Sequence, residues 1–236
     1  MGDKTETTPS GDPVLRHGEA APFQRPETSA TNVEAVTAHV ERHIGRCDMV
    51  FHEIISDKIH LDLLWVPPSE ALPGNVLVTS GMSDLPMTVP DEPDWQDLRH
   101  AELLIVLPPN WPLSGWRFRW DRYFWPLRWL KTMARFPHDY GTCLGPGHTL
   151  GNGEPPERLG KGTDLSGVLI MPPLTFEEGF LVLERPGRPP INFYAMIPIH
   201  TAELTYKLEQ GLDALLDRFD EAGISEYIDP KRRSVV

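Results

Sequence analysis

Apolar residues fill two short stretches of the chain, residues 75–79 and 102–107, almost without a break. Strands that are covered on both faces of a sheet have this pattern, because neither side of them meets water. The pattern therefore predicts two central strands. Shorter runs of apolar and β-branched residues predict further strands at 49–55, 59–66, 167–171, 180–184 and 191–199.

The runs 49–55 and 59–66 are separated by three polar residues and are expected to form a hairpin. Apolar and mostly polar residues alternate along the second run, so we expect it to bury one face and leave the other polar. A turn at residues 56–57 places Glu53 opposite His60, a favourable cross-strand pair that needs no catalytic explanation.

Apolar residues recur at helical spacing near both ends of the chain. Val33, Val36 and Val40 predict a first helix that begins after residues 31–32 and ends at Gly45. A last helix is expected from residue 200 or 201 to about residue 222, with an apolar stripe that Gly211 interrupts.

Two prolines frame a third helical segment in the middle of the chain. Pro126 suits the first turn of a helix, and Pro137 is expected to end it. Within this helix Trp125 and Trp129 lie near an apolar stripe, so core packing explains them best. A shorter helix or turn is expected at 116–124, and a loop or short helix at 91–100.

Strands outnumber helices, and the two kinds of element do not alternate strictly. We therefore predict an α/β (α+β) fold with a single domain, in which a mixed, largely antiparallel central sheet is flanked by helices. Residues 1–30 are rich in proline and small polar residues and are expected to form a disordered tail ahead of a domain at 31–236. Residues 138–165 contain many glycines and are expected to form a long surface loop.

The charge balance narrows the range of partners. The chain has 236 residues with 22 Lys and Arg against 34 Asp and Glu, a formal net charge of −12. Nucleic acids and anionic membranes bind basic surfaces, so we expect neither as a partner; a basic protein partner is compatible with this charge. The two cysteines, Cys47 and Cys143, form no metal-binding or disulfide pattern, and no secretory signal or membrane span is visible, so we expect a cytoplasmic protein.

Catalytic motifs are incomplete wherever they begin. His52-Glu53 opens like the zinc motif HExxH but ends in Ser56. It also lies on an expected strand, whereas two histidines four apart need a helix to bind one metal ion together. The Gly160-Lys161-Gly162-Thr163 stretch lacks the first glycine of a phosphate-binding loop, and the serines after residue 79 lack the leading glycine of a nucleophile elbow. Ser80 and Ser83 are therefore interpreted as turn residues. We expect no catalytic residue, no metal ligand and no cofactor.

Four residues remain as candidates for contact with a partner. Trp111 and Trp116 lie in loop-like sequence, and tryptophan dominates binding hot spots because it buries much area at low entropic cost. Asp139 and His148 flank the glycine-rich segment and, with His138, could converge on a metal ion, although loop histidines are usually plain surface residues. His52, Glu53, His60 and Asp62 form another possible cluster on adjoining strands.

Five short motifs occur in an order that resembles the suppressor of fused (Sufu) domain family. They are Gly81-Met82-Ser83 followed by Met87-Thr88-Val89-Pro90, the strand from Glu102 to Ile105 leading to residues 107–111, Trp125-Pro126-Leu127, residues 134–137, and Gly147-His148-Thr149. The resemblance spans about residues 33–233. Each motif is weak alone, but their order over one domain makes the resemblance specific.

The resemblance implies binding rather than catalysis. Animal members of the family restrain Gli-type transcription factors by holding an extended peptide through strand addition, a mode in which the edge of a sheet supplies hydrogen bonds. Since this chain ends soon after its last expected helix, it resembles the stand-alone bacterial type, some members of which are proposed immunity proteins that neutralise toxins. We expect a non-enzymatic protein-binding domain that acts as an immunity-type inhibitor or regulator of a basic, toxin-like partner.

Two alternatives stay open at this point. One is a metal- or acid/base-dependent enzyme that uses the glycine-rich loop around Asp139 and His148. A stoichiometric bound metal that is lost in the His148→Ala variant would support it. The other is a structural or oligomeric role with the tryptophans buried at a self-interface, which sizing in solution would show.

Overall fold

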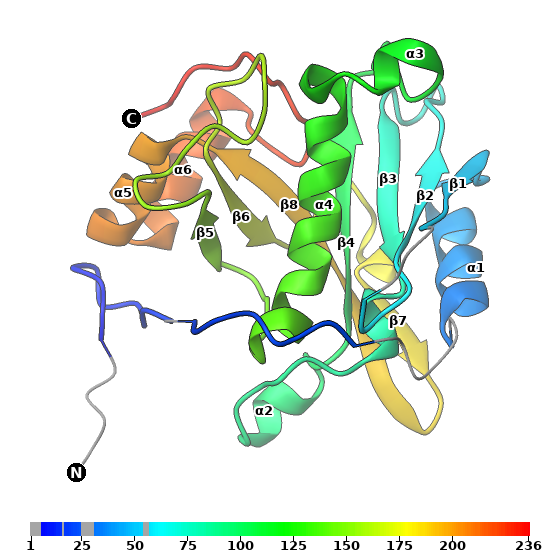
Figure 1. Ribbon diagram of the computed structural model, residues 1–236, viewed down its shortest axis with the longest axis horizontal. Coiled ribbons are helices and arrows are strands. Elements are labelled where there is room, and N and C mark those ends of the chain that lie inside the picture. The colour runs from blue at the N-terminus through cyan, green and yellow to red at the C-terminus, as the bar shows by residue number, and fades with distance from the viewer. Residues whose placement is uncertain (1–5, 16, 25–30, 54–56) are drawn as a thin grey trace.

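A computed structural model describes residues 6–15, 17–24, 31–53 and 57–236. Its centre is an eight-stranded sheet with the order β1-β2-β3-β4-β8-β6-β5, in which β7 also pairs with β8 (Figure 1). Every pair of neighbouring strands is antiparallel except β4 and β8, which run parallel. The predicted fold class, α/β with a mixed and largely antiparallel sheet, is confirmed.

The central strands form where apolar runs predict them. β3 covers Asn75–Ser80 and β4 covers Ala101–Leu107, and every residue of both strands is buried. The other strands are β1 (Met49–Phe51), β2 (Asp62–Val66), β5 (Thr149–Gly151), β6 (Gly167–Met171), β7 (Val182–Arg185) and β8 (Arg188–Ile199). β8 pairs with β4 along one edge and with β7 and then β6 along the other, so it joins the two halves of the sheet.

The hairpin of β1 and β2 differs in detail from the expected one. Its register pairs Phe51 with Leu63, which shifts Glu53 away from His60. The Glu53 carboxylate instead accepts hydrogen bonds from Arg135 and from the Leu61 backbone N–H. Asp62 and Leu64, expected on the polar face opposite the buried one, are both buried, because helices cover both sides of the sheet. Residues 54–56, which include part of the expected turn, lie outside the described residues.

Helices cover the sheet on both faces. α4 (Asp121–Tyr140) packs on one face, where Trp125, Leu130 and Met133 join strand residues such as Leu103 in one core cluster. α1 (Val33–His43) and α6 (Leu212–Ala222) cover the opposite face in a second cluster. The shorter helices are α2 (Pro93–Gln96), α3 (Gly115–Phe118) and α5 (Thr201–Gln210). The expected first helix is therefore present, and the segment 91–100, expected to be a loop or a short helix, contains the short helix α2.

Proline and glycine set helix boundaries differently from the prediction. Pro126 and Pro137 both lie inside α4, so Pro126 does not begin the helix and Pro137 does not end it. The helix begins at Asp121, after the extended residue Trp120, and ends at Gly141, which adopts the left-handed conformation that glycine allows. Gly211, with φ of 95°, divides the expected last helix into α5 and α6.

A buried glutamate joins β3 to β4 through the turn that follows β3. Glu102, fully buried in β4, accepts hydrogen bonds from the Gly81 N–H and the Ser83 N–H at 3.0 Å each, the Ser83 hydroxyl at 2.7 Å and the Thr79 hydroxyl at 2.5 Å. Ser83 is thus a turn residue as expected, but its hydroxyl bonds a side chain rather than its own backbone. Ser80 belongs to β3.

The N-terminal segment contacts the domain over its described part. It was expected to be a disordered tail, yet the Ser10 N–H donates to the Leu208 carbonyl and the Ala21 N–H donates to the Asp139 carbonyl. In Figure 1 the segment, drawn in blue, crosses the end of α4. Residues 138–165 are likewise less irregular than expected, since they include the last turn of α4 and strand β5. Within the described ranges no helix is long and apolar enough to cross a membrane.

Candidate functional site

Large aromatic side chains are exposed where α3 and α4 meet. Trp116 in α3 is 67% exposed, Trp120 between the helices is 44% exposed, and Phe124 in α4 is 37% exposed. The Trp116 and Trp120 rings are in edge contact with centroids 4.7 Å apart, and Trp120 stacks on Tyr123 at 6.4 Å. We call Trp116, Trp120, Tyr123 and Phe124, with the arginines described below, the aromatic surface.

The break between the two helices turns these residues outward. Trp120 has an extended backbone, and α4 starts directly after it. Asp121 in the first turn of α4 pairs with Arg128 at 2.5 Å and accepts the Lys161 N–H at 2.8 Å. The hydrogen bond from Arg128, followed by that from Lys161, lowers the pKa of Asp121, so its carboxylate stays charged where a helix N-terminus favours negative charge. The first turn of α4 is thereby fixed.

Arginines give the aromatic surface a positive charge. Arg117, Arg119 and Arg122 are all exposed. The Arg122 guanidinium lies 5.2 Å from the centroid of the Tyr123 ring, within cation–π range. Neither Arg117 nor Arg119 forms an ion pair with another described residue. The local charge is therefore opposite in sign to the net charge of −12.

The two tryptophans expected at a binding surface differ in position. Trp116 is the most exposed aromatic residue of the aromatic surface. Trp111 is only partly buried, but its indole N–H donates to the Tyr123 carbonyl at 3.0 Å and its ring packs edge-on against Tyr123 at 5.6 Å. Trp111 thus supports the aromatic surface from beneath. Trp125 is fully buried, as expected for core packing.

Asp139 and His148 belong to separate environments. Asp139, in the last turn of α4, forms an ion pair with Lys58 at 3.0 Å, and the Lys58 side chain is only 9% exposed. His148 lines a cleft on the other side of the α4 C-terminus, where burial lowers its pKa. Among the described residues, the one group of three His, Cys, Asp or Glu residues with ligand atoms within 4.8 Å of one another is His52, His60 and Asp62. Asp139, His138 and His148 therefore form no such group.

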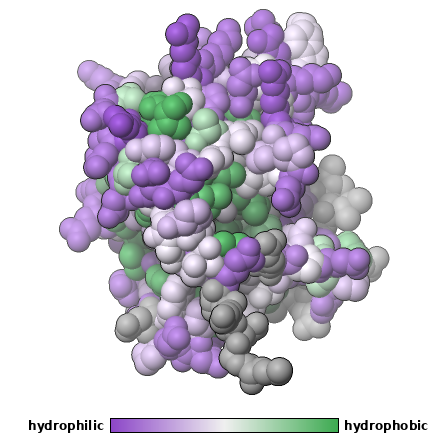
Figure 2. Space-filling view, turned by 90° about the vertical axis from the view of Figure 1, so that its left-hand side faces the viewer, coloured by the Kyte–Doolittle hydropathy of each residue, from purple (hydrophilic) through white to green (hydrophobic). Residues whose placement is uncertain are grey.

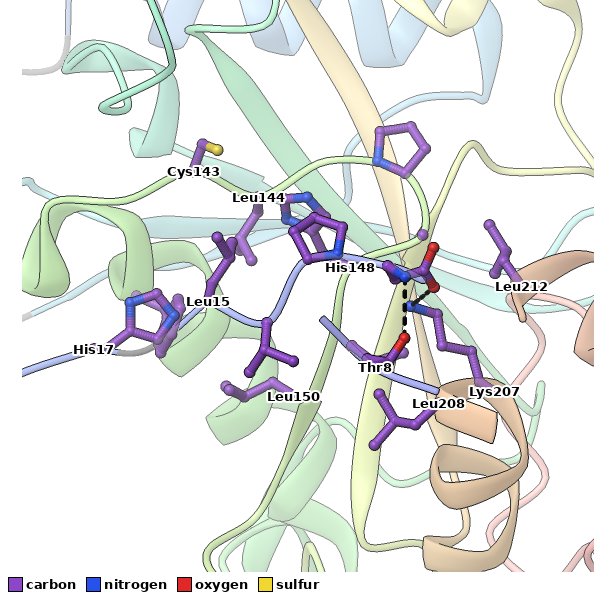
Figure 3. A pocket seen from close by; sticks show the side chains of 17 residues that line it. Thr8, Leu15, His17, Cys143, Leu144, His148, Leu150, Lys207, Leu208 and Leu212 are labelled. Carbon is purple, nitrogen blue, oxygen red and sulfur yellow. Dashed lines mark hydrogen bonds and ion pairs between the residues drawn. The ribbon is translucent and has the colours of Figure 1, made fainter. Parts of the chain in front are cut away.

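The cleft beside His148 lies beneath the N-terminal segment and has a volume of about 350 Å³. One wall comes from Leu144, His148 and Leu150, and another from α5 through Lys207 and Leu208 (Figure 3). The Lys207 ammonium pairs with Asp12 at 2.9 Å, which holds the N-terminal segment in place. Figure 2 shows hydrophobic residues gathered in the middle of this side of the molecule, among hydrophilic ones.

Trp116 was expected from the sequence to contact a partner, whereas Trp120, Phe124 and the arginines around them were not. The signal was the alternation of aromatic residues with arginine over residues 116–124. Trp, Tyr and Arg are the residue types that dominate binding hot spots, so their alternation on a short helix and its following turn is informative.

The fold and its motifs place the chain in one family. Residues 57–233 match the family described as suppressor of fused protein (SUFU), and the chain belongs to this family. No curated protein sequence matches the chain.

Two solved structures have a similar fold. The crystal structure of a protein described as a SUFU homologue from Neisseria gonorrhoeae FA 1090 has a TM-score of 0.61 and 18% identity, and the match covers 88% of this chain and 98% of the other. A chain in the crystal structure of the Sufu–Fu complex has a TM-score of 0.60 and 14% identity, with 88% of this chain and 93% of the other covered. At these identities the similarity shows the fold alone.

Proposed function

We propose that this chain is a non-enzymatic protein-binding domain and that its partner docks on the aromatic surface. The observation that carries the proposal is the exposure of Trp116 and Trp120, whose rings are in contact, together with that of Phe124 four residues further along the chain. Exposing large aromatic rings to water is unfavourable, and monomeric proteins rarely expose contiguous apolar patches without a role in binding. A second support is the family, whose structural neighbours include a chain solved in the Sufu–Fu complex.

The charge of the aromatic surface defines the chemistry of the partner. Arg117 and Arg119 have no acidic partner among the described residues, and a carboxylate can bind a guanidinium through two hydrogen bonds. The partner face we propose therefore presents Asp or Glu beside apolar groups. This replaces the basic partner that the net charge of −12 led us to expect.

An immunity-type role is the finer form of this proposal. In that role the domain binds and neutralises a toxin encoded by a neighbouring gene. Co-expression tests this: cells that make the toxin survive with the native chain and die with a chain altered at the aromatic surface. Survival with the altered chain would contradict the proposed surface, and absence of rescue by the native chain would contradict the immunity role alone.

Affinity measurements test the docking surface directly. A partner is identified by affinity capture, purified, and titrated calorimetrically with native chain, with Trp116→Ala/Trp120→Ala, and with Leu174→Ala as control. Leu174 is 64% exposed and lies outside the aromatic surface. Loss of a hot-spot residue costs about 2 kcal/mol or more, so we expect the double variant to bind at least about 30-fold more weakly. An unchanged affinity would refute the assignment. The assignment would also be refuted if the native chain and the Leu174→Ala control bound single-stranded oligonucleotides and the double variant did not, because the surface would then bind nucleic acid.

A further inference from the structure

Two histidines and an aspartate converge at the edge of the sheet that carries β1. His52 follows β1, Asp62 is the first residue of β2, and His60 lies two residues before it. The Asp62 carboxylate faces both rings: His52 Nδ1 lies 2.9 Å from Oδ2, and His60 Nε2 lies 3.2 Å from Oδ1. The three ligand atoms lie within 4.8 Å of one another, a grouping with no equal elsewhere in the described part of the chain.

These distances suit a metal ion bound by three protein ligands. Zn²⁺ binds imidazole nitrogens and carboxylate oxygens in tetrahedral sites at about 2.0–2.2 Å, which places neighbouring ligand atoms about 3.3 Å apart. The two separations involving Asp62 are close to this value, but they end on different oxygens of its carboxylate. The rings therefore have to shift toward each other for both to bind the ion that the carboxylate holds. Each imidazole can keep its remaining proton on the nitrogen that points away from Asp62.

The ligands differ in exposure in a way that leaves room for a further ligand. The side chain of Asp62 is 7% exposed, that of His60 is 33% exposed and that of His52 is 71% exposed. Asp62 is thus a fixed anchor, while His52 lies at the solvent boundary. An ion held here keeps one coordination position open to water or to a group from another molecule.

Residues around Asp62 hold its carboxylate in position. The Glu53 backbone N–H donates to Asp62 Oδ1 at 3.1 Å. The Glu53 side chain is itself engaged by Arg135 and by the Leu61 N–H, so it supports the site without being a ligand. Supporting contacts of this kind orient ligands and raise the affinity of metal sites.

We propose that His52, His60 and Asp62 form a zinc-binding site with one open coordination position. The alternative is a pair of hydrogen bonds from the two rings to one carboxylate, which has the same geometry and needs no ion. The proposal revises the expectation from the sequence that the chain has no metal ligands. It is independent of partner binding at the aromatic surface.

Nearby positive charge limits how tightly the site can bind. Lys131 on α4 interacts electrostatically with both Glu53 and Asp62, and Arg135 lies on the same helix one turn later. A cation near Asp62 competes with a metal ion for the carboxylate charge. We therefore expect Lys131→Met to bind Zn²⁺ several-fold more tightly than the native chain, a change that hydrogen bonding alone does not predict.

Calorimetric titration with Zn²⁺ tests the site, using the full chain without a histidine tag. We expect one ion per native chain and, in parallel, the visible spectrum of a four-coordinate ion when Co²⁺ is used. His52→Ala and Asp62→Asn should each weaken binding by at least about tenfold. His52 is largely exposed, so its removal should not prevent folding.

His148→Ala is the matched control, since this histidine lies in the cleft beside α5. It should bind Zn²⁺ as the native chain does. The proposal is overturned if the native chain binds no stoichiometric ion, or if His52→Ala and Asp62→Asn bind as tightly as the native chain. It is also overturned if binding is lost in His148→Ala instead.

Discussion

Replacing Glu102 should destabilise the fold more than substituting any exposed residue, because four hydrogen-bond donors share the Glu102 carboxylate as their acceptor. In Glu102→Ala the Gly81 and Ser83 N–H groups and the Thr79 and Ser83 hydroxyls lose their partner in a fully buried place. Each buried polar group left unpaired costs about 1–3 kcal/mol, and the cost is reduced where water enters. We expect a loss of about 4 kcal/mol or more, a large share of the 5–15 kcal/mol that stabilises a typical domain.

Glu102→Gln separates the loss of hydrogen bonds from the loss of charge. Burial, as the largest effect, raises the pKa of Glu102 despite the four donors. The glutamine side chain is uncharged, like the protonated carboxyl group that burial favours. It also has nearly the same shape as the glutamate side chain and retains one oxygen that can accept hydrogen bonds. We expect Glu102→Gln to cost about 1 kcal/mol, well below the cost of the alanine substitution.

Urea denaturation followed by fluorescence measures both free energies of unfolding, with Glu178→Ala as control. Glu178 is exposed, and the control should lie within about 0.5 kcal/mol of the native chain. If Glu102→Ala also lies within about 1 kcal/mol of the native chain, Glu102 does not hold the turn to β4 and the reasoning is wrong.

Three further predictions concern the turn, the pH dependence and the N-terminal segment. Gly81→Ala should lower the free energy of unfolding, measured by urea denaturation, by at least about 2 kcal/mol, since φ is 120° and a Cβ would lie 1.9 Å from the His60 carbonyl oxygen. Gly18→Ala is the control, because Gly18 has open space around it, and its free energy of unfolding should hardly change. Burial lowers the pKa of His138 to about 4, so as the pH falls below 6.5 this histidine gains a proton in the unfolded chain before it does in the folded chain. The free energy of unfolding should therefore decrease between pH 6.5 and about 4, by up to about 1.4 kcal/mol per pH unit from this group. The decrease should be less steep in His138→Gln. Lys207→Met removes the ion pair with Asp12 and should speed proteolysis within residues 6–15, while Arg218→Met should not; equal cleavage of both would contradict the role given to this pair.

The sequence predicted the strands better than the helix boundaries, for physical reasons. β3 and β4 are buried on both faces, and their short apolar runs match that burial directly. Pro126 was placed at a helix start because it lacks an N–H, but it is buried within α4, where packing offsets the missing hydrogen bond. Local preferences therefore gave way to tertiary contacts.

The candidate sites depended on contacts that sequence spacing does not contain. Trp111 and Trp116 have the same residue type and similar surroundings in the sequence. Trp111 is nevertheless held inward by its hydrogen bond and ring contact with Tyr123, while Trp116 is exposed. The convergence of His52 and His60 on Asp62 depends on the register of β1 against β2, and a shift by one residue changes which side chains share a face. The acidic composition also concealed the basic character of the aromatic surface, because net charge averages over the whole molecule.

Site-specific photo-crosslinking tests most directly whether a partner docks on the aromatic surface. A photoreactive phenylalanine analogue is placed at position 116 or, as control, at position 174, and each chain is irradiated with the purified partner. The account predicts a crosslinked complex from position 116 that excess native chain suppresses, and none from position 174. Crosslinking from position 174 alone, or equally from both, would contradict it.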